Sequence, residues 1–284
     1  MGGHSMSRGM NCAPPLHSSA AGASSDGMKL ALSGKGGVGK TTLAALLAAA
    51  LVRRGYAILA IDADPAPNLG GALGLPAAEA ERLVPIAEDA DLVAAKTETG
   101  YPGVYNLSFP VEDVISERAV MTPAGVGLLV MGTVRAAGGG CTCPAAAVVR
   151  ALLRRLVVGE RQAVVLDLEA GLEHLGRGTA AGVDLLLVLV DGSAASCGVA
   201  GRIRDLAREL GIPRLALVGS RLGGDADVEA ARDCAKRLDL PLLAVLPDDP
   251  AVARAGREGG PVPTTGTTAA LVDALLDDLL AEAA

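Results

Sequence analysis

Short apolar runs and longer helix-forming segments alternate along this chain from Met28 to its end. Uninterrupted runs of Leu, Val, Ile and Ala are typical of strands that are buried on both faces, and Ala/Leu-rich segments with charged residues at helical spacing indicate helices. The expected strands are 28–33, 56–62, 126–130, 163–167, 183–191, 215–218 and 242–246, and the expected helices are 43–52, 145–158, 201–210, 225–238 and 267–283. This alternation predicts an α/β fold, a doubly wound and mostly parallel sheet with helices on both faces.

A glycine-rich loop, GKGGVGKTT at residues 34–42, lies between the first expected strand and the first expected helix. It fits the pattern G-x-x-x-x-G-K-[ST], in which successive backbone N–H groups and the helix N-terminus surround a phosphate. We expect Lys40 to reach the β- and γ-phosphates and the Thr41 hydroxyl to bind Mg²⁺. The residues expected to cradle the nucleotide are Gly34, Gly36, Gly37, Val38, Gly39, Lys40, Thr41 and Thr42. The strand–loop–helix context favours a P-loop NTPase over a glycine-rich turn.

Acidic residues follow two of the buried runs, where parallel strands present their carboxyl ends to a ligand. Asp62 ends the second strand and is followed by Asp64, while Asp167 ends the strand 163–167. Asp167 fits a place behind Mg²⁺, with a turn or cap aspartate as the alternative. Asp64 precedes Pro65 and could also be a turn former. Gly171 has the backbone freedom that a loop sensing the γ-phosphate requires.

Two cysteines two residues apart follow a run of three glycines, in GGGCTCP at residues 138–144. In an extended segment, Cys141 and Cys143 point the same way, so both thiols can face one site. A closed tetrahedral thiolate site needs four ligands, which a symmetric dimer would supply as two pairs. On spacing alone, metal binding and a pair of ordinary loop thiols both remain open.

Composition narrows the possible partners. The formal net charge of −7 disfavours non-specific nucleic-acid binding, which requires a basic face. Apolar runs stay shorter than the roughly 18–20 residues that span a bilayer, so no membrane association is expected. Hydrophobic residues make up 50% of the chain and aromatic residues only 1%, so the core must consist of Leu, Val, Ala and Ile.

The five cysteines are an odd number, and a P-loop enzyme implies a reducing cytoplasmic setting, so no disulfide framework is expected. Cys197 and Cys234 are interpreted as buried, inert thiols. Residues 1–27 are rich in Gly, Ser, Ala and Pro and lack the apolar core of a signal peptide. We expect a disordered extension at 1–27 and one P-loop ATPase domain at 28–284.

A second lysine in the loop, Lys35, is not required by the general pattern and could be a solvated charge. The whole loop GKGGVGKTT, however, resembles the deviant Walker A motif of the MinD/ParA/Mrp/nitrogenase iron-protein class of P-loop ATPases. The resemblance implies a nucleotide-bound homodimer in which Lys35 touches the phosphates held by the partner subunit. It also implies that Asp62 works near Mg²⁺ and its waters, and that Asp64 orients the attacking water, within the positioning logic of phosphoryl transfer. The implied catalytic set is therefore Lys35, Lys40 and Asp64.

The glycine-rich Cys-x-Cys motif, together with EAGLEH at 169–174 and RGT at 177–179, resembles the CooC-type accessory ATPases. This family is implicated in nickel insertion into carbon monoxide dehydrogenase. The resemblance implies that Cys141 and Cys143 bind Ni²⁺ or Zn²⁺ between two subunits. It also implies ATP hydrolysis and an apo-metalloenzyme client such as carbon monoxide dehydrogenase. One departure concerns the base: many relatives have an Asn-Lys-type pair, whose Asn contacts adenine, where this chain has Gly219, Ser220 and Arg221.

Two other functions remain open at this point. A positioning ATPase of the MinD or ParA type would need a basic amphipathic tail or a basic DNA-binding face, whereas residues 276–282 (LDDLLAE) are acidic. An iron–sulfur carrier of the Mrp type would use the same thiol pair, because thiolates accept nickel, zinc and clusters alike.

Overall fold

An eight-stranded sheet forms the centre of the computed structural model, which describes residues 27–99, 101, 109–132, 148, 151–154, 156, 158–169 and 182–283. Its strand order is β3-β4-β2-β5-β1-β6-β7-β8. The strands are β1 Met28–Gly34, β2 Ala57–Ala63, β3 Val120–Met121, β4 Gly127–Val130, β5 Gln162–Leu168, β6 Leu185–Val190, β7 Leu215–Leu222 and β8 Leu242–Pro247. The short edge strand β3 pairs antiparallel with β4, and the other neighbours pair in parallel. The predicted mostly parallel sheet is confirmed.

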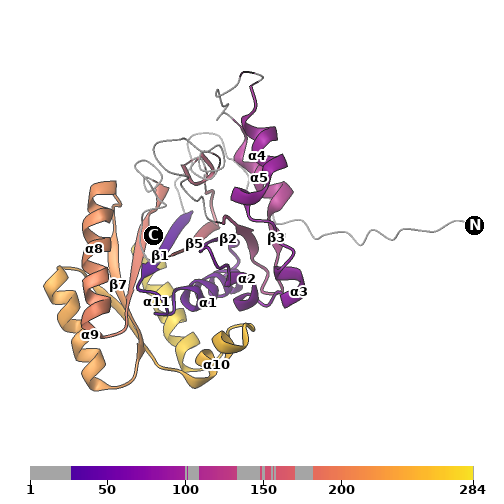
Figure 1. Ribbon diagram of the computed structural model, residues 1–284. Helices are drawn as coiled ribbons and strands as arrows, with labels where there is room; N and C mark the ends of the chain where they lie inside the picture. The colour runs from indigo at the N-terminus through magenta and orange to yellow at the C-terminus, as the bar shows by residue number, and fades with distance from the viewer. Residues whose placement is uncertain are drawn as a thin grey trace, which may run out of the picture.

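Helices cover both faces of this sheet (Figure 1). On one side lie α1, α2 and α11, and on the other lie η1, α4, α5, α8 and α9. The helices are α1 Lys40–Arg53, α2 Leu69–Ala72, α3 Ala77–Ala80, the 3₁₀ turn η1 Ile86–Glu88, α4 Ala90–Thr97, α5 Val111–Arg118, α8 Ala194–Leu210, α9 Asp225–Leu238, α10 Pro250–Glu258 and α11 Thr267–Ala283. This doubly wound arrangement is the one that the alternating sequence pattern predicts.

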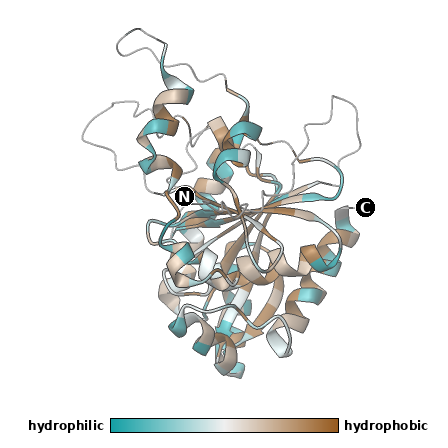
Figure 2. Ribbon diagram, turned by 90° about the vertical axis from the view of Figure 1, so that its right-hand side faces the viewer, coloured by the Kyte–Doolittle hydropathy of each residue, from teal (hydrophilic) through white to brown (hydrophobic). Residues whose placement is uncertain are grey.

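Side chains of each central strand alternate between two hydrophobic clusters. In β2, Ile58 and Ala60 belong to the cluster that also contains residues of α1 and α11, whereas Leu59 and Ile61 belong to the cluster on the other face, which also contains residues of α4, α5, α8 and α9. A strand whose two faces are both buried needs apolar residues at successive positions, which explains the unbroken runs in the sequence. The colouring by hydropathy in Figure 2 shows the apolar strands enclosed between the helical layers.

Several elements differ from the expected set. The helix expected from residue 201 begins at Ala194, because the side chain of Ser193 caps it by accepting a hydrogen bond from the N–H of Ser196. Helix α10 was not predicted, although Asp249 at its N-cap followed by Pro250 is a typical start signal. The antiparallel strand β3 was also missed, since a two-residue strand has no periodicity to detect. Of the expected helix 145–158, Val148 and residues 151–154 are described as helical.

The interpretation of Cys197 and Cys234 as free thiols is wrong. They form a disulfide that joins the first turn of α8 to the last turn of α9, with their Cα atoms 5.8 Å apart. Both residues are buried, as expected, in the cluster between these helices and the sheet. The sequence could not reveal the bond because the pairing depends on how two separate helices pack side by side.

In the described part of the chain, no helix is long and apolar enough to cross a membrane.

Candidate nucleotide-binding site

The glycine-rich loop follows β1, which lies between β5 and β6 in the sheet. After β1 the chain passes to β2 on one side, and it later returns to β6 on the other side of β1. Such a reversal of direction opens a crevice at the carboxyl ends of the strands, where ligands of doubly wound sheets bind. The loop therefore lies at the ligand-binding edge.

Glycine is required in this loop by space and by conformation. A Cβ on Gly34 would lie 2.7 Å from the carbonyl oxygen of Leu189 in the neighbouring strand, and the φ of Gly34 is +149°. Gly39, directly before α1, has a φ of +102°. Both values are unfavourable for residues with a side chain. Val38 is 1% exposed and belongs to the hydrophobic core, so its side chain anchors the loop rather than facing a ligand.

The side chain of Lys40 is buried under the loop, with 7% of the residue exposed. Its ammonium group donates hydrogen bonds to the carbonyl oxygens of Gly34 at 3.3 Å and Lys35 at 3.4 Å. These two hydrogen bonds hold the ammonium group at the centre of the loop, where a bound anion would be surrounded.

Thr41, in the first turn of α1, donates a hydrogen bond from its hydroxyl to Oδ2 of Asp167 at 2.6 Å. Asp167 is paired in register with Asp62 across β5 and β2, and the two residues are 2% and 0% exposed. Oδ1 of Asp167 is buried without a hydrogen-bond partner. Two buried carboxyl groups and a hydroxyl thus converge beside the loop.

Burial raises the pKa of both carboxyl groups, to about 6 for Asp62 and about 7 for Asp167. The Thr41 hydrogen bond counteracts the shift at Asp167, while the charge of Asp62 adds to it. Backbone N–H groups of Leu69 and Asp64 counteract the shift at Asp62 by donating to its two oxygens, at 2.9 and 3.1 Å. The unpaired Oδ1 of Asp167 and the hydroxyl of Thr41 are hard oxygen donors, the kind of ligand that Mg²⁺ prefers.

Asp64 lies in the loop that follows β2 and lines the same cavity as Lys40 and Thr41. Its Oδ1 accepts a hydrogen bond from the N–H of Ala66 at 2.9 Å, so it also forms the local turn that its place before Pro65 suggests. The turn continues to Asn68, which precedes α2. Asp64 therefore forms a local turn and also lines the cavity.

Lys35 forms an ion pair with Asp191 at 3.2 Å, and the two side chains are 39% and 25% exposed. Asp191 follows β6, and its Oδ1 accepts hydrogen bonds from the hydroxyl of Ser193 at 2.6 Å and from the N–H of Ser193 at 3.0 Å. Burial opposes ionisation, but the Ser193 hydrogen bonds and the Lys35 charge together lower the pKa of Asp191. The sequence placed Asp191 at the end of an expected strand without recognising this role.

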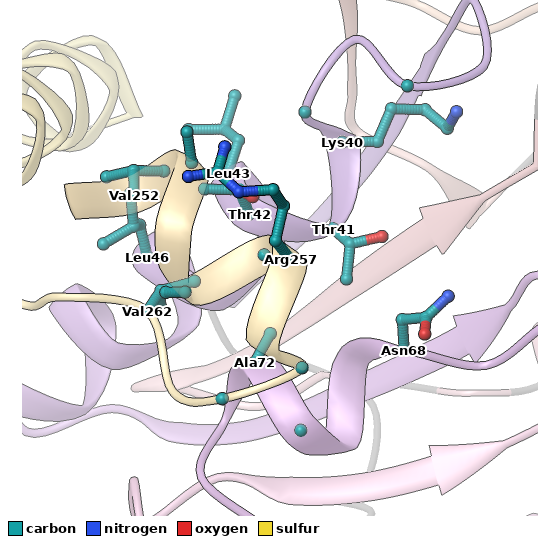
Figure 3. A pocket seen from close by; sticks show the side chains of 18 of the residues that line it. Lys40, Thr41, Thr42, Leu43, Leu46, Asn68, Ala72, Val252, Arg257 and Val262 are labelled. Atoms are coloured by element: carbon teal, nitrogen blue, oxygen red, sulfur yellow. The ribbon is translucent and has the colours of Figure 1, made fainter. Parts of the chain in front are cut away.

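An open cavity of about 860 Å³ extends from the loop toward α10 (Figure 3). Its phosphate end is formed by Gly36, Gly37, Gly39, Lys40, Thr41 and Thr42. The far wall comes from the ends of β7 and β8 and from α10, and it includes Ser220, Arg221, Pro247, Asp248, Val252 and Arg257. The volume is in the range of small-molecule and cofactor sites, so the cavity can take a whole nucleotide. Asp248 and α10 were missed because their contribution depends on the neighbouring strand ends.

Three predicted site residues, Cys141, Cys143 and Gly171, lie outside the described residues. Among the residues that are described, no group of three or more His, Cys, Asp and Glu side chains could hold a metal ion.

The strand–loop–helix unit with its buried aspartates defines a nucleotide-binding P-loop domain. Residues 29–262 match the family described as CobQ/CobB/MinD/ParA nucleotide binding domain, and the chain belongs to that family. The chain is 41% identical over 233 residues to the carbon monoxide dehydrogenase accessory protein CooC of Rhodospirillum rubrum, covering 82% of this chain and 88% of that protein. It is 36% identical over 239 residues to an uncharacterised ATP-binding protein of Methanocaldococcus jannaschii, covering 83% and 91%. The chain is thus a CooC-like ATP-binding protein.

Solved structures agree with this fold. The septum site-determining protein MinD of Pyrococcus horikoshii, complexed with Mg-ADP, superposes with a TM-score of 0.64 at 22% identity, covering 91% of this chain and 99% of that one. Cobyrinic acid a,c-diamide synthase of Mycobacterium smegmatis, with a bound ATP analog and magnesium, gives a TM-score of 0.62 at 20% identity, with coverages of 89% and 94%. At these identities the likeness shows the fold alone.

Proposed function

We propose that this protein hydrolyses ATP and uses the cycle to deliver a metal ion to an apo-metalloenzyme. The observation that carries the ATPase part is the convergence of Thr41 and two buried aspartates beside a lysine-bearing phosphate loop. The orphaned Asp167 oxygen supports a cation at this point, because a buried oxygen without a partner is unfavourable.

The loop would bind the phosphates through its N–H groups and Lys40, and Thr41, Asp62 and Asp167 would hold Mg²⁺. Bound Mg²⁺ would neutralise charge on the β- and γ-phosphates. For this the two aspartates must ionise. Their raised pKa values place this ionisation close to neutral pH, and a bound cation would favour the ionised form of both groups.

Asp64 orients a water molecule for attack on the γ-phosphorus. The bond between the γ-phosphorus and the β,γ-bridging oxygen breaks, the water oxygen bonds to the phosphorus, and ADP and inorganic phosphate form. The proton released from the water passes to phosphate or to solvent. Support comes from the position of Asp64 in the cavity. The hydrogen bond from its backbone N–H to Oδ1 of Asp62 also holds the turn in which it lies.

Lys35 acts across a homodimer in this proposal, where it reaches the phosphates bound by the partner subunit. The ion pair with Asp191 would then be exchanged for phosphate contacts when two nucleotide-bound subunits meet. Both side chains are partly exposed, so the exchange needs no opening of the core.

Cys141 and Cys143 from each subunit would supply four thiolates, which suit a tetrahedral site for Ni²⁺ or Zn²⁺. The metal is cargo: the nucleotide-bound dimer holds it and hydrolysis releases it to the client. The relative named as a carbon monoxide dehydrogenase accessory protein supports that enzyme, or a related metalloenzyme, as the client for nickel. The likeness to MinD supports the fold alone and adds nothing to a positioning role.

Metal stoichiometry and phosphate release test the two halves of the proposal separately. We expect the wild-type protein to bind about one nickel or zinc ion per dimer and to release phosphate from ATP with Mg²⁺. A Cys141→Ser/Cys143→Ser variant should lose the metal and keep ATP binding. Lys40→Ala should lose phosphate release and keep the thiol pair that binds the metal. Cys12→Ser, which changes a cysteine far from the motif in sequence, is the matched control. Unchanged metal content in the double variant would refute the carrier role.

A further inference from the structure

Arg221 has a left-handed backbone conformation inside a strand, with a φ of +59°. Of the other described residues with positive φ and a side chain, Asp239 caps the end of α9 and Arg161 lies in the turn before β5. Those two positions are ordinary places for this conformation. In β7 it is unfavourable, and backbone strain of this kind gathers where a side chain has a task.

The strained backbone directs the Arg221 side chain away from the sheet and onto the phosphate loop. The register between β7 and β8 is irregular between Gly219 and Leu222, so the end of β7 bends at this point. Nη1 of Arg221 then donates a hydrogen bond to the carbonyl oxygen of Gly37 at 2.7 Å. Nε lies 3.8 Å from Oδ1 of Asp248, which restrains the guanidinium from the other side.

The top of the phosphate loop, Gly36 and Gly37, is exposed and has no packing of its own. A Cβ at either position would meet nothing within 4 Å. Lys40 holds the carbonyl groups of Gly34 and Lys35, below this point. Arg221 therefore ties down a pair of glycines that would otherwise be free to take many conformations.

Fixing the Gly37 carbonyl also fixes the next N–H group. In a planar trans peptide the two groups point in opposite directions, so the N–H of Val38 stays turned toward the interior of the loop, where it donates to the carbonyl of Lys35 at 3.3 Å. We propose that Arg221 is a positioning residue that preorganises the phosphate loop for the diphosphate of a nucleotide. This inference rests on the proposed nucleotide function. Preorganisation raises affinity because less conformational freedom is lost on binding.

Removing the side chain should weaken the binding of ADP and ATP equally, by about tenfold, because both nucleotides carry the diphosphate. The kcat for ATP should change less than about threefold, since Lys40 and Asp64 remain in place. Arg221→Gly is the sharpest variant, because glycine accepts the left-handed backbone and the fold is kept while the guanidinium is lost. Arg221→Lys keeps one charged donor and should recover part of the affinity.

The experiment compares the wild type, both Arg221 variants and Arg232→Ala by titration with fluorescent ADP, steady-state ATP hydrolysis and thermal melting. Arg232 is an exposed arginine on α9, 3.5 Å from Glu229, and serves as the matched control. We expect Arg221→Gly to melt no lower than the wild type while its dissociation constant and KM rise, and the control to bind normally. An unchanged dissociation constant in Arg221→Gly, or Arg221→Lys no better than glycine, would overturn the inference and leave the proposed function standing. A wild type that binds no nucleotide would overturn both.

Discussion

Asp62 and Asp167 face one another at paired positions of β2 and β5, and each is almost wholly buried. One oxygen of Asp167 accepts the Thr41 hydroxyl and the other has no partner. Burial is the main cause of both raised pKa values; the charge of Asp64 also raises the pKa of Asp62, and the charge of Asp62 also raises the pKa of Asp167. Two buried carboxyl groups this close repel one another when ionised, and a divalent cation bound between them would offset that repulsion.

The pH dependence of stability should report this pair. Their folded pKa values, about 6 and about 7, lie above the value of 3.8 expected in the unfolded chain. Between about pH 4 and 7 the folded state therefore binds more protons, so the contribution of the pair to stability falls as pH rises through this range. Between pH 5 and pH 7.5, the free energy of unfolding of the magnesium-free wild type should fall by more than that of Asp167→Asn, as measured by denaturant titration. Asp205→Asn, an exposed control, should behave as the wild type; equal losses in all three would contradict the assignment.

Thr41→Val should separate nucleotide binding from hydrolysis. The substitution keeps the shape of the side chain but removes the hydroxyl that bonds to Asp167 and would bind Mg²⁺. We expect phosphate release to fall by about 10²-fold, the scale of losing one preorganised electrostatic contact. ADP binding without magnesium should change little, as measured by fluorescence titration. Thr264→Val, at an exposed position outside the cavity, is the control. Full magnesium-dependent activity in Thr41→Val would show that the hydroxyl only caps Asp167.

Lys35→Ala should weaken both ATP hydrolysis and nucleotide-dependent dimerisation. Asp191→Ala is the complementary variant, because it removes the carboxylate that pairs with Lys35 and leaves the lysine in place. Size-exclusion chromatography with light scattering, with and without ATP, measures the assembly. We expect Asp191→Ala to dimerise at least as well as the wild type. Normal hydrolysis and dimerisation in Lys35→Ala would show that this lysine is a surface charge.

Loss of the Cys197–Cys234 disulfide should lower stability without changing the nucleotide site. The bond closes a loop with a sequence separation of 37 residues. The chain-entropy relation gives roughly 3–4 kcal/mol for a loop of this length. Urea denaturation of the wild type with and without a reductant measures the effect, and a Cys197→Ser/Cys234→Ser variant should not respond to the reductant. Titration of free thiols in the unfolded chain, without a reductant, gives the control. Five reactive cysteines would show that the disulfide is absent.

The strands were predictable because burial on both faces leaves an unbroken apolar run, as in β2, β5 and β6. Boundaries set by local contacts were less visible: Ser193 starts α8 earlier than the pattern suggests, and α10 has no buried residue to mark its face. The antiparallel edge strand β3 depends on pairing with β4, which no local signal announces. The division of the chain at residue 27 and the metal site at Cys141 and Cys143 stay predictions.

The sequence by itself determined the phosphate loop, because the residues that form it are consecutive. Their geometry is set by the glycine conformations and by the start of one helix. It also determined the class of fold, through the alternation of buried strands and helices. Only the tertiary structure decided what surrounds the loop. The Asp62–Asp167 pair depends on β2 and β5 being neighbours, the Lys35–Asp191 contact joins residues 156 positions apart, and the Arg221 contact joins residues 184 positions apart. Such contacts follow from strand order and packing, which residue spacing along the chain does not encode.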